Sequence, residues 1–234
     1  MSYRSRPLLV AGFIVVAVVC ARLGVWQVSR LRERRAANAL AMKARAAPPI
    51  ELTAEVGDSS LSGRRVRARG HYDHAHDVVL RGRVYLGVPG VEIVSPLVLG
   101  SDTAAVLVDR GFVPTPDAVT IASDSFREPG PKIVQGLLIP LPSGRGAPIG
   151  RGDQTTWARL DRDALSRRLP YRIYPYSILQ LPDSSLPRFP RRLEAPPLDD
   201  GPHLSYAIQW FSFSLIALVF AGIMARQRHH PAVQ

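Results

Sequence analysis

The sequence predicts an α+β membrane protein in which two transmembrane helices flank a mostly antiparallel β-sheet or partial barrel with one or two helices. Three observations lead to this prediction. Two apolar runs with at most one charge lie near the two ends of the 234-residue chain. Between them come short apolar segments bounded by Gly, Pro or Asp, which is typical of strands. A proline-rich connector without periodicity joins these segments to the second run.

The first apolar run extends from Pro7 to Ala21 and continues to Ser29 with Arg22 as its single charge. At about 1.5 Å per residue, this length covers a hydrocarbon core of about 30 Å. Arg22 would lie near one membrane face, where its long stem can reach water. A cleaved signal peptide is the alternative, since residues 19–21 are a tolerable cleavage site. The run continues past that site, which favours a retained helix.

The second run, His203 to Ala225, has no formal charge and a similar length. Arginines outside both spans favour cytoplasmic tails, whereas the arginines at 30–35 oppose that orientation. Because long domains cross a membrane largely regardless of charge, we expect the segment between the spans to lie outside the cytoplasm. The predicted divisions are a first span at 1–29, an extracytoplasmic domain at 30–200, a second span at 201–226 and a cytoplasmic tail at 227–234.

Residues 30–46 are rich in alanine and arginine and predict a helix that continues the first span until Pro48. A second helix is expected at about Asp161 to Leu169, with Asp161 as its N-cap. Pro96 indicates an edge or a bulge rather than a central strand. The expected strands are residues 64–72, 77–83, 90–99, 104–113, 132–140 and 176–181, and the side chains of Val66, Ala68, Gly70 and Tyr72 share one face of the first.

The net charge of +11 comes almost wholly from arginine, since Lys43 and Lys132 are the only lysines. Arginine suits the capture of carboxylates or phosphates, while an arginine bias of the source genome explains the count equally well. Residues 30–200 are net positive, which suits an anionic membrane surface. The sequence contains no nucleic-acid-binding motif, so we expect membrane lipid and no nucleic acid among its partners.

The stretch "HYDHAHD" (71–77) has three histidines beside two aspartates and looks at first like a metal site. A polar loop between two strands is the simpler interpretation, because no second cluster supplies further ligands. The sequence contains no nucleophile elbow, zinc-protease motif or Ser-Lys pair. We therefore expect no enzyme. A membrane-tethered enzyme that uses His71, His74 and His76 stays as an alternative.

The start of the second run, "PHLSYAIQWFSF" (202–213), brings a histidine and aromatic residues to the membrane surface. Pro202 can take the first helical position with Gly201 as the N-cap. A neutral imidazole is a common axial ligand of heme iron, and an aromatic face below it would form half of a heme pocket. An aromatic belt that anchors the helix is the alternative. The residues expected on this face are His203, Tyr206, Ala207, Trp210 and Ser214.

Heme propionates need cationic partners near the membrane surface. Arg22 and Arg30 are the candidates if the two spans pack together, and Trp26 on the first span would add an aromatic side chain to the pocket. The predicted cofactor site therefore combines these three residues with the histidine face of the second span.

Five segments of the sequence together resemble the SURF1/Shy1 family of cytochrome oxidase assembly proteins. They are "RLGVWQVSRLRERRA" (22–36), "RGHYDHAHDVVLRGR" (69–83), "VEIVSPLVLGSDTAAVLVDRGFVP" (91–114), "TWARLDRDAL" (156–165) and "HLSYAIQWFSFSLIALVFAGI" (203–223). The resemblance covers the chain from end to end. The family's usual asparagines before the histidine are replaced here by Gly201 and Pro202.

The resemblance implies a protein of the bacterial inner membrane that helps to assemble heme-copper oxidases. It implies binding of heme a, with His203 as the axial ligand of the iron, and delivery from heme A synthase to cytochrome c oxidase subunit I. Only six residues precede the first span, which is too short for a mitochondrial presequence. The alternative is a scaffold without a cofactor that contacts oxidase subunits through "VLVDRGFVP" (106–114) and the outer sheet.

Overall fold

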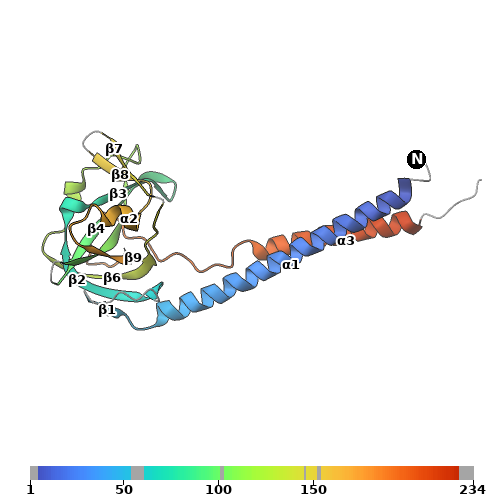
Figure 1. Ribbon diagram of the computed structural model, residues 1–234, viewed down its shortest axis with the longest axis horizontal. Helices are drawn as coiled ribbons and strands as arrows, with labels where there is room; N and C mark the ends of the chain where they lie inside the picture. Colours follow the sequence, from blue (N-terminus) through green and yellow to red (C-terminus); the bar gives the residue numbers. More distant parts are fainter. Residues whose placement is uncertain (1–4, 54–60, 101–102, 145, 152–153, 227–234) are drawn as a thin grey trace, which may run out of the picture. The chain divides into compact units, whose positions relative to one another are not determined.

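The computed structural model describes residues 5–53, 61–100, 103–144, 146–151 and 154–226 (Figure 1). The chain forms two compact units, one of residues 1–40 and 198–234 and the other of residues 41–197. The predicted cytoplasmic tail at 227–234 lies outside the described residues. The other predicted boundaries concern depth in a membrane and stay predictions.

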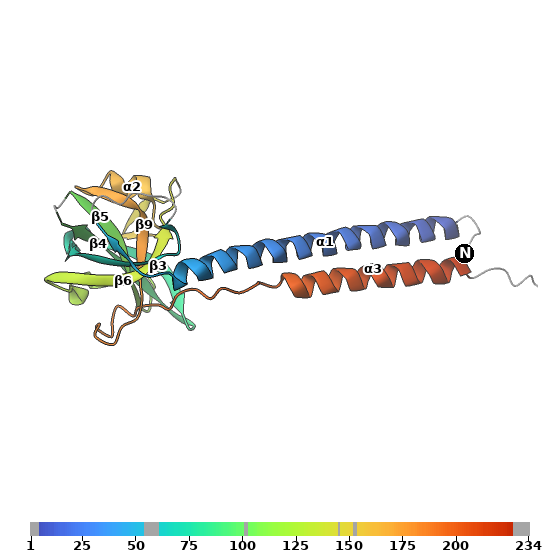
Figure 2. The same ribbon diagram turned by 90° about the horizontal axis from the view of Figure 1, so that it is seen from below.

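The first unit contains two long antiparallel helices, α1 (Ser5–Ala46) and α3 (His203–Arg226), which lie side by side in both ribbon views (Figures 1 and 2). The continuation of the first apolar run into residues 30–46 as one helix is confirmed. Both helices are long and apolar enough to cross a membrane, with mean hydropathies of 2.6 and 1.9 in their most apolar windows.

The two helices pack through a stripe of mostly small side chains. Buried positions alternate at spacings of three and four residues, a repeat that favours a left-handed supercoil. Small residues let helix backbones approach closely. The Ser214 hydroxyl donates a 2.8 Å hydrogen bond across the stripe to the carbonyl of Ala17. The buried positions are Ala17, Cys20, Gly24, Gln27 and Leu31 on α1 and Ala207, Ser214, Ala217 and Ala221 on α3.

The second unit is a β-barrel of five strands. These are β2 (Arg65–Tyr72), β4 (Val88–Leu99), β5 (Ala104–Pro114), β6 (Pro131–Pro140) and β9 (Arg172–Gln180). The ring runs β2-β6-β9-β5-β4 and closes where β4 pairs with β2. Its interior is an apolar core, and the predicted common face of β2 is confirmed because Val66, Ala68 and Tyr72 belong to that core.

Four shorter or peripheral strands extend the ring. β3 (Val78–Tyr85) pairs with the first half of β4, and β8 (Gln154–Trp157) and β7 (Pro148–Arg151) follow it outward. β1 (Ile50–Leu52) lies beside β2. The expected six strands and the mostly antiparallel sheet are confirmed. The pairs β1–β2, β3–β8 and β5–β9 are parallel and were not expected.

Helices of the barrel unit are short. The expected N-cap is confirmed, since the Asp161 carboxylate accepts a 2.9 Å hydrogen bond from the Ala164 amide at the start of α2 (Arg162–Ser166). This helix is shorter than expected and ends three residues earlier. Two 3-10 helices, η2 (His74–His76) and η3 (Ser123–Phe126), were not predicted.

The prediction that Pro96 marks an edge strand is wrong, because β4 is an interior strand with neighbours on both sides. The proline lies where the neighbour on one side changes: the pairing with β3 ends at Val94 and the pairing with β2 begins at Leu97. At this junction the Pro96 carbonyl accepts a hydrogen bond from the Asp73 amide. The missing N–H of the proline therefore costs the sheet at most one hydrogen bond. A bulge does occur nearby, between Ile93 and Val94.

Candidate functional site

The candidate site lies at the first turn of α3, within the helical unit. The Pro202 carbonyl accepts a 3.1 Å hydrogen bond from the Tyr206 amide, so Pro202 is the N-cap and the helix begins at His203. The expected cap at Gly201 is therefore wrong by one residue. Gly201 instead takes a φ of +66°, and its amide donates to the Asp199 carboxylate at 3.0 Å. This turn directs the chain into the helix.

The imidazole of His203 is held by a residue of α1 that the sequence analysis missed. Its Nδ1 lies 2.9 Å from Oε1 of Gln27, a residue 9% exposed. An amide oxygen can only accept, so Nδ1 carries the proton and the lone pair is on Nε2. Among the described residues, Nε2 has no hydrogen-bond partner. A hydrogen-bond acceptor at one ring nitrogen is the usual way in which a protein orients a histidine for metal ligation through the other.

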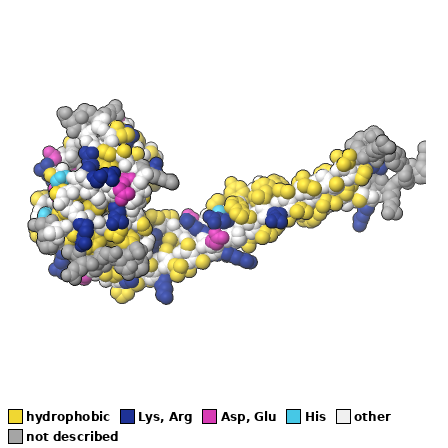
Figure 3. Space-filling model, in the orientation of Figure 1, with side chains coloured by type: hydrophobic (Ala, Val, Ile, Leu, Met, Phe, Trp, Pro, Cys, Tyr) yellow, Lys and Arg dark blue, Asp and Glu magenta, His cyan; other side chains and the backbone are white. Residues whose placement is uncertain are grey.

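A groove of about 430 Å³ lies beside the imidazole. Its walls come from two segments of the helical unit: four residues of the polar part of α1 and three residues at the start of α3. Ala37 and Gly201 contribute little bulk, so the groove is open next to His203. The lining residues are Arg30, Glu33, Arg34, Ala37, Gly201, Pro202 and His203. Figure 3 shows basic, acidic and histidine side chains together where the continuous apolar surface of the helix pair ends.

Two guanidinium groups of the groove are held by weak, exposed contacts. Arg30 pairs with Glu33 at 2.6 Å, and both side chains are more than half exposed. Arg34 donates to the Asp199 carbonyl at 3.2 Å. Exposed ion pairs contribute at most about 1 kcal/mol, so both cations can turn to an anionic ligand at low cost. Arg34 was not a predicted site residue.

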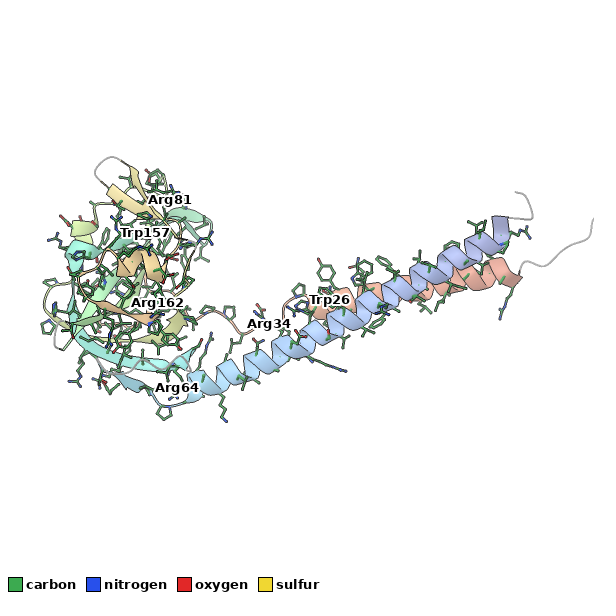
Figure 4. All side chains as sticks on the ribbon, viewed as in Figure 1. Trp26, Arg34, Arg64, Arg81, Trp157 and Arg162 are labelled. Atoms are coloured by element: carbon green, nitrogen blue, oxygen red, sulfur yellow. The ribbon has the colours of Figure 1, made fainter. Side chains whose placement is uncertain are left out.

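The other predicted site residues lie outside the groove. Arg22 is exposed and lies about 12 Å from Arg30 along the helix axis. Trp26 is 53% exposed on α1, and Figure 4 shows it near the start of α3. Trp210 is half-buried on α3 and contacts Phe213 of the same helix edge to face, with ring centroids 6.0 Å apart. Tyr206 is 47% exposed on α3.

The histidine-rich stretch of the barrel unit is a polar turn. His76 Nδ1 contacts the Asp73 carboxylate at 2.7 Å. His74 uses both nitrogens, since Nδ1 contacts the Asp77 carboxylate at 3.1 Å and Nε2 accepts from the Glu128 amide at 3.0 Å. Across the described part of the chain, no group of three or more His, Cys, Asp or Glu residues is arranged to hold a metal ion.

A buried ion cluster adjoins this turn. The fully buried guanidinium of Arg110 donates to Glu128 at 2.7 Å and to Ser95 at 3.1 Å. Arg192 donates to the other side of the same cluster, at Glu128 and Gln180. Burial raises the pKa of Glu128, but hydrogen bonds from the two arginines outweigh it and hold the pKa below its usual value. The Asp77 carboxylate lies 3.9 Å from Arg110 and supplies a second negative charge, so two arginines face two carboxylates inside the protein.

The segment 106–114, which contains Arg110, also binds the part of the chain that leads to α3. Gly111 has a φ of +109°, and a Cβ atom there would lie 2.0 Å from the Arg191 carbonyl oxygen. This close approach allows Phe112 and Arg191 to exchange two backbone hydrogen bonds, of 2.9 and 2.7 Å. In the segment 106–114 only Pro114 is exposed, Asp109 is partly buried and the other residues are buried. The segment therefore contributes to the packing of the barrel unit, and the expected docking of oxidase subunits through it stays a prediction.

Comparison with known proteins gives consistent matches. A family model described as the SURF1 family matches residues 14–215. A SURF1-like protein of Rickettsia felis is 27% identical over 222 residues, covering 91% of this chain and 95% of the relative. A SURF1-like protein of Monosiga brevicollis is 25% identical, covering 91% and 85%. An uncharacterized SURF1-like protein of Mycobacterium tuberculosis (strain ATCC 25618 / H37Rv) is 29% identical, covering 88% and 80%.

Proposed function

This chain belongs to the SURF1 family, and we propose that it is a membrane-bound assembly factor for a heme-copper terminal oxidase, cytochrome c oxidase. In this proposal it binds heme a and assists its delivery to subunit I, receiving it from heme A synthase. Helices α1 and α3 cross the bacterial inner membrane with both termini in the cytoplasm, and the barrel lies outside it. The chain acts as a carrier and not as an enzyme.

The observation that carries the proposal is the contact between His203 and Gln27. It joins the two apolar helices and orients the imidazole with Nε2 available beside a groove. A neutral imidazole nitrogen with a fixed tautomer is a suitable axial ligand for heme iron. An imidazole that served only as a wet interfacial group would not need a buried amide to orient it.

The residues of the groove fit the chemistry of a heme. Nε2 of His203 would ligate the iron, and Arg30 and Arg34 would hold the propionates. Trp26, Tyr206 and Trp210 would face the apolar macrocycle from outside the groove, and Arg22 would contact headgroups. When bound, heme a supplies the redox centre that the oxidase requires.

The same residues support release. A single protein nitrogen and two exposed arginines give a moderate affinity, and a carrier that bound too tightly could not transfer its cargo. Glu33 and Asp199 compete for the two guanidinium groups. They therefore provide alternative partners for the arginines once the propionates leave.

Absorption spectroscopy tests the proposal. The full-length protein is purified in detergent from cells that make heme A, and its spectrum is compared with those of His203→Ala and a control, His76→Ala. We expect His203→Ala to lose the bound heme and the control to keep it, because His76 lies on the polar turn of the barrel unit. Equal heme in the wild type and His203→Ala would refute the ligand assignment.

The second candidate function is a scaffold that stabilises oxidase assembly intermediates without a cofactor. The barrel unit supports it, since apolar side chains such as Val84, Leu86 and Ile133 are exposed on its surface. An unchanged heme content in His203→Ala together with lost oxidase assembly would favour the scaffold. Loss of both would favour the carrier.

A further inference from the structure

The turn between β3 and β4 has an unusual residue at its tip. Tyr85 and Val88 form the last pair of the two strands, and Leu86 and Gly87 connect them. Leu86 has a φ of +49° and Gly87 a φ of +79°. Positive φ at both central residues defines a type I′ turn, for which Asn-Gly is the preferred sequence. A leucine in this conformation is strained, so its presence needs a reason outside the turn.

The side chains around this turn are apolar and exposed. Val84 is 70%, Leu86 81% and Val88 47% exposed. Directly paired residues of two strands share one face of a hairpin. Val84 pairs with Pro89 and Tyr85 with Val88, so the tip is apolar on both faces. Because these side chains are exposed, packing inside the barrel unit does not explain why they are apolar.

Cations lie beside the tip. Tyr85 lines a cavity of about 290 Å³ together with Arg188 and Arg191, and the Arg191 guanidinium lies 5.1 Å from the centre of its ring. Asp183 and Glu194 also line this cavity. Within the described residues, neither Arg188 nor Arg191 forms an ion pair. Two arginines without an ion pair, next to protruding aliphatic side chains, complement a layer of anionic headgroups above an apolar layer.

We propose that the tip of the β3–β4 hairpin, residues 84–88, inserts into the membrane interface while Arg188 and Arg191 contact anionic lipid headgroups. A tip that is apolar on both faces suits a fluid medium that surrounds it, whereas a flat protein surface would cover one face only. The proposal rests on the membrane location proposed above. That location keeps a bilayer at a high effective concentration, because the barrel unit is on the same chain as α1 and α3.

The test uses an environment-sensitive fluorophore in the full-length chain. Cys20 is replaced by alanine, and a single cysteine for labelling is introduced as Val84→Cys, Leu215→Cys or Ser62→Cys. Leu215 is 63% exposed on α3 and reports membrane insertion of the helices, while Ser62 is an exposed turn residue of the barrel unit. Each protein is placed in nanodiscs of phosphatidylcholine with or without phosphatidylglycerol, and quenching by doxyl-labelled lipid is measured.

We expect lipid quenching at position 84 in discs that contain phosphatidylglycerol and a loss of quenching at high salt, with no quenching at position 62. Adding Leu86→Asn to the Val84→Cys protein should reduce the quenching. Because asparagine suits the type I′ turn, this variant retains the fold. Quenching at position 215 but not at 84 would overturn the hairpin proposal and would not affect the proposed membrane location. Contact with a protein partner would then be the explanation for the apolar tip. Quenching at neither position would overturn the proposed membrane location.

Discussion

Histidines in the two units of the molecule have opposite surroundings. In the barrel, His74 has both ring nitrogens engaged, by a carboxylate and by a backbone amide of a buried ion cluster. In the helical unit, His203 has one nitrogen engaged by a neutral amide, and the other faces a groove with two arginines. The difference teaches that a histidine can bind a ligand only through a ring nitrogen that is not already hydrogen-bonded within the protein. Histidine-rich sequence alone does not reveal it.

The largest effect is expected from Glu128→Ala. It leaves Arg110 and Arg192 buried without their shared carboxylate, which should lower the free energy of unfolding by about 3–5 kcal/mol. Chemical denaturation of the full-length protein in detergent, followed by tryptophan fluorescence, measures this. Glu51→Ala is the control, because its ion pair with Arg67 is exposed and should contribute less than about 1 kcal/mol.

The pH dependence adds a second check on the same cluster. The pKa of Glu128 is lowered in the folded protein, so its stabilisation is present at neutral pH and is lost as the pH falls. If Glu128→Ala lowered the stability no more than the control does, the buried ion cluster would not be needed for the stability of the barrel unit. The contrast drawn between the surroundings of His74 and His203 would then lose its meaning.

The next largest effect concerns His203, whose Nε2 faces the groove. Gln27→Leu removes the acceptor that fixes the His203 tautomer, so the affinity for heme should fall by about 10- to 100-fold. Titration of the purified, heme-free protein with heme measures it. Gln209→Leu on the exposed side of α3 is the matched control and should bind as the wild type does. Equal affinities for both variants would mean that the contact orients nothing of functional value.

A smaller effect is expected from Asp109→Asn, beside the buried cluster. Burial, followed by the charge of Glu92, raises the pKa of Asp109 to about 7. The folded protein then keeps a proton that the unfolded chain loses above the ordinary aspartate pKa of 3.8, so stability falls as the pH rises toward 7 and is level beyond. The variant should flatten this decline, measured as melting temperature against pH. An unchanged profile would contradict the assignment.

The smallest effect is a gain. Leu86→Asn replaces a strained residue by one that adopts positive φ readily, and it should stabilise the protein by about 1 kcal/mol or less. Val84→Asn, at an exposed position outside the turn, should give no gain. Melting temperatures of the two variants decide the matter. If Leu86→Asn destabilised the fold, the leucine would serve packing and not an external surface.

The sequence predicted the parts of the fold that have a local signal. Apolar length identified α1 and α3, and alternation or turn residues identified β2 to β6 and β9. The three- and four-residue strands β1, β7 and β8 are too short for periodicity to show. The parallel pair β5–β9 joins distant segments, and no local pattern encodes such a pairing.

The site was predicted only in part for the same reason. His203 and Arg30 carry recognisable chemistry, but Gln27 is 176 residues from its partner and has no chemistry of its own to mark it. The repeat of Ala17, Cys20, Gly24 and Gln27 at alternating spacings of three and four was the signal that could have found it. Arg34 could have been found from its position one turn beyond Arg30.

Closure of the barrel has a consequence for biosynthesis. The ring is complete only when β9, its last strand in the chain, pairs with β5 and β6. Residues 181–202 alone separate β9 from α3. Since proteins are made from the N-terminus and non-local strand pairing is slow, the second apolar helix should emerge from the ribosome while the ring is still open. Membrane integration and barrel closure would then compete in time, and a chaperone that shields the open strand edges would raise the yield of the mature protein.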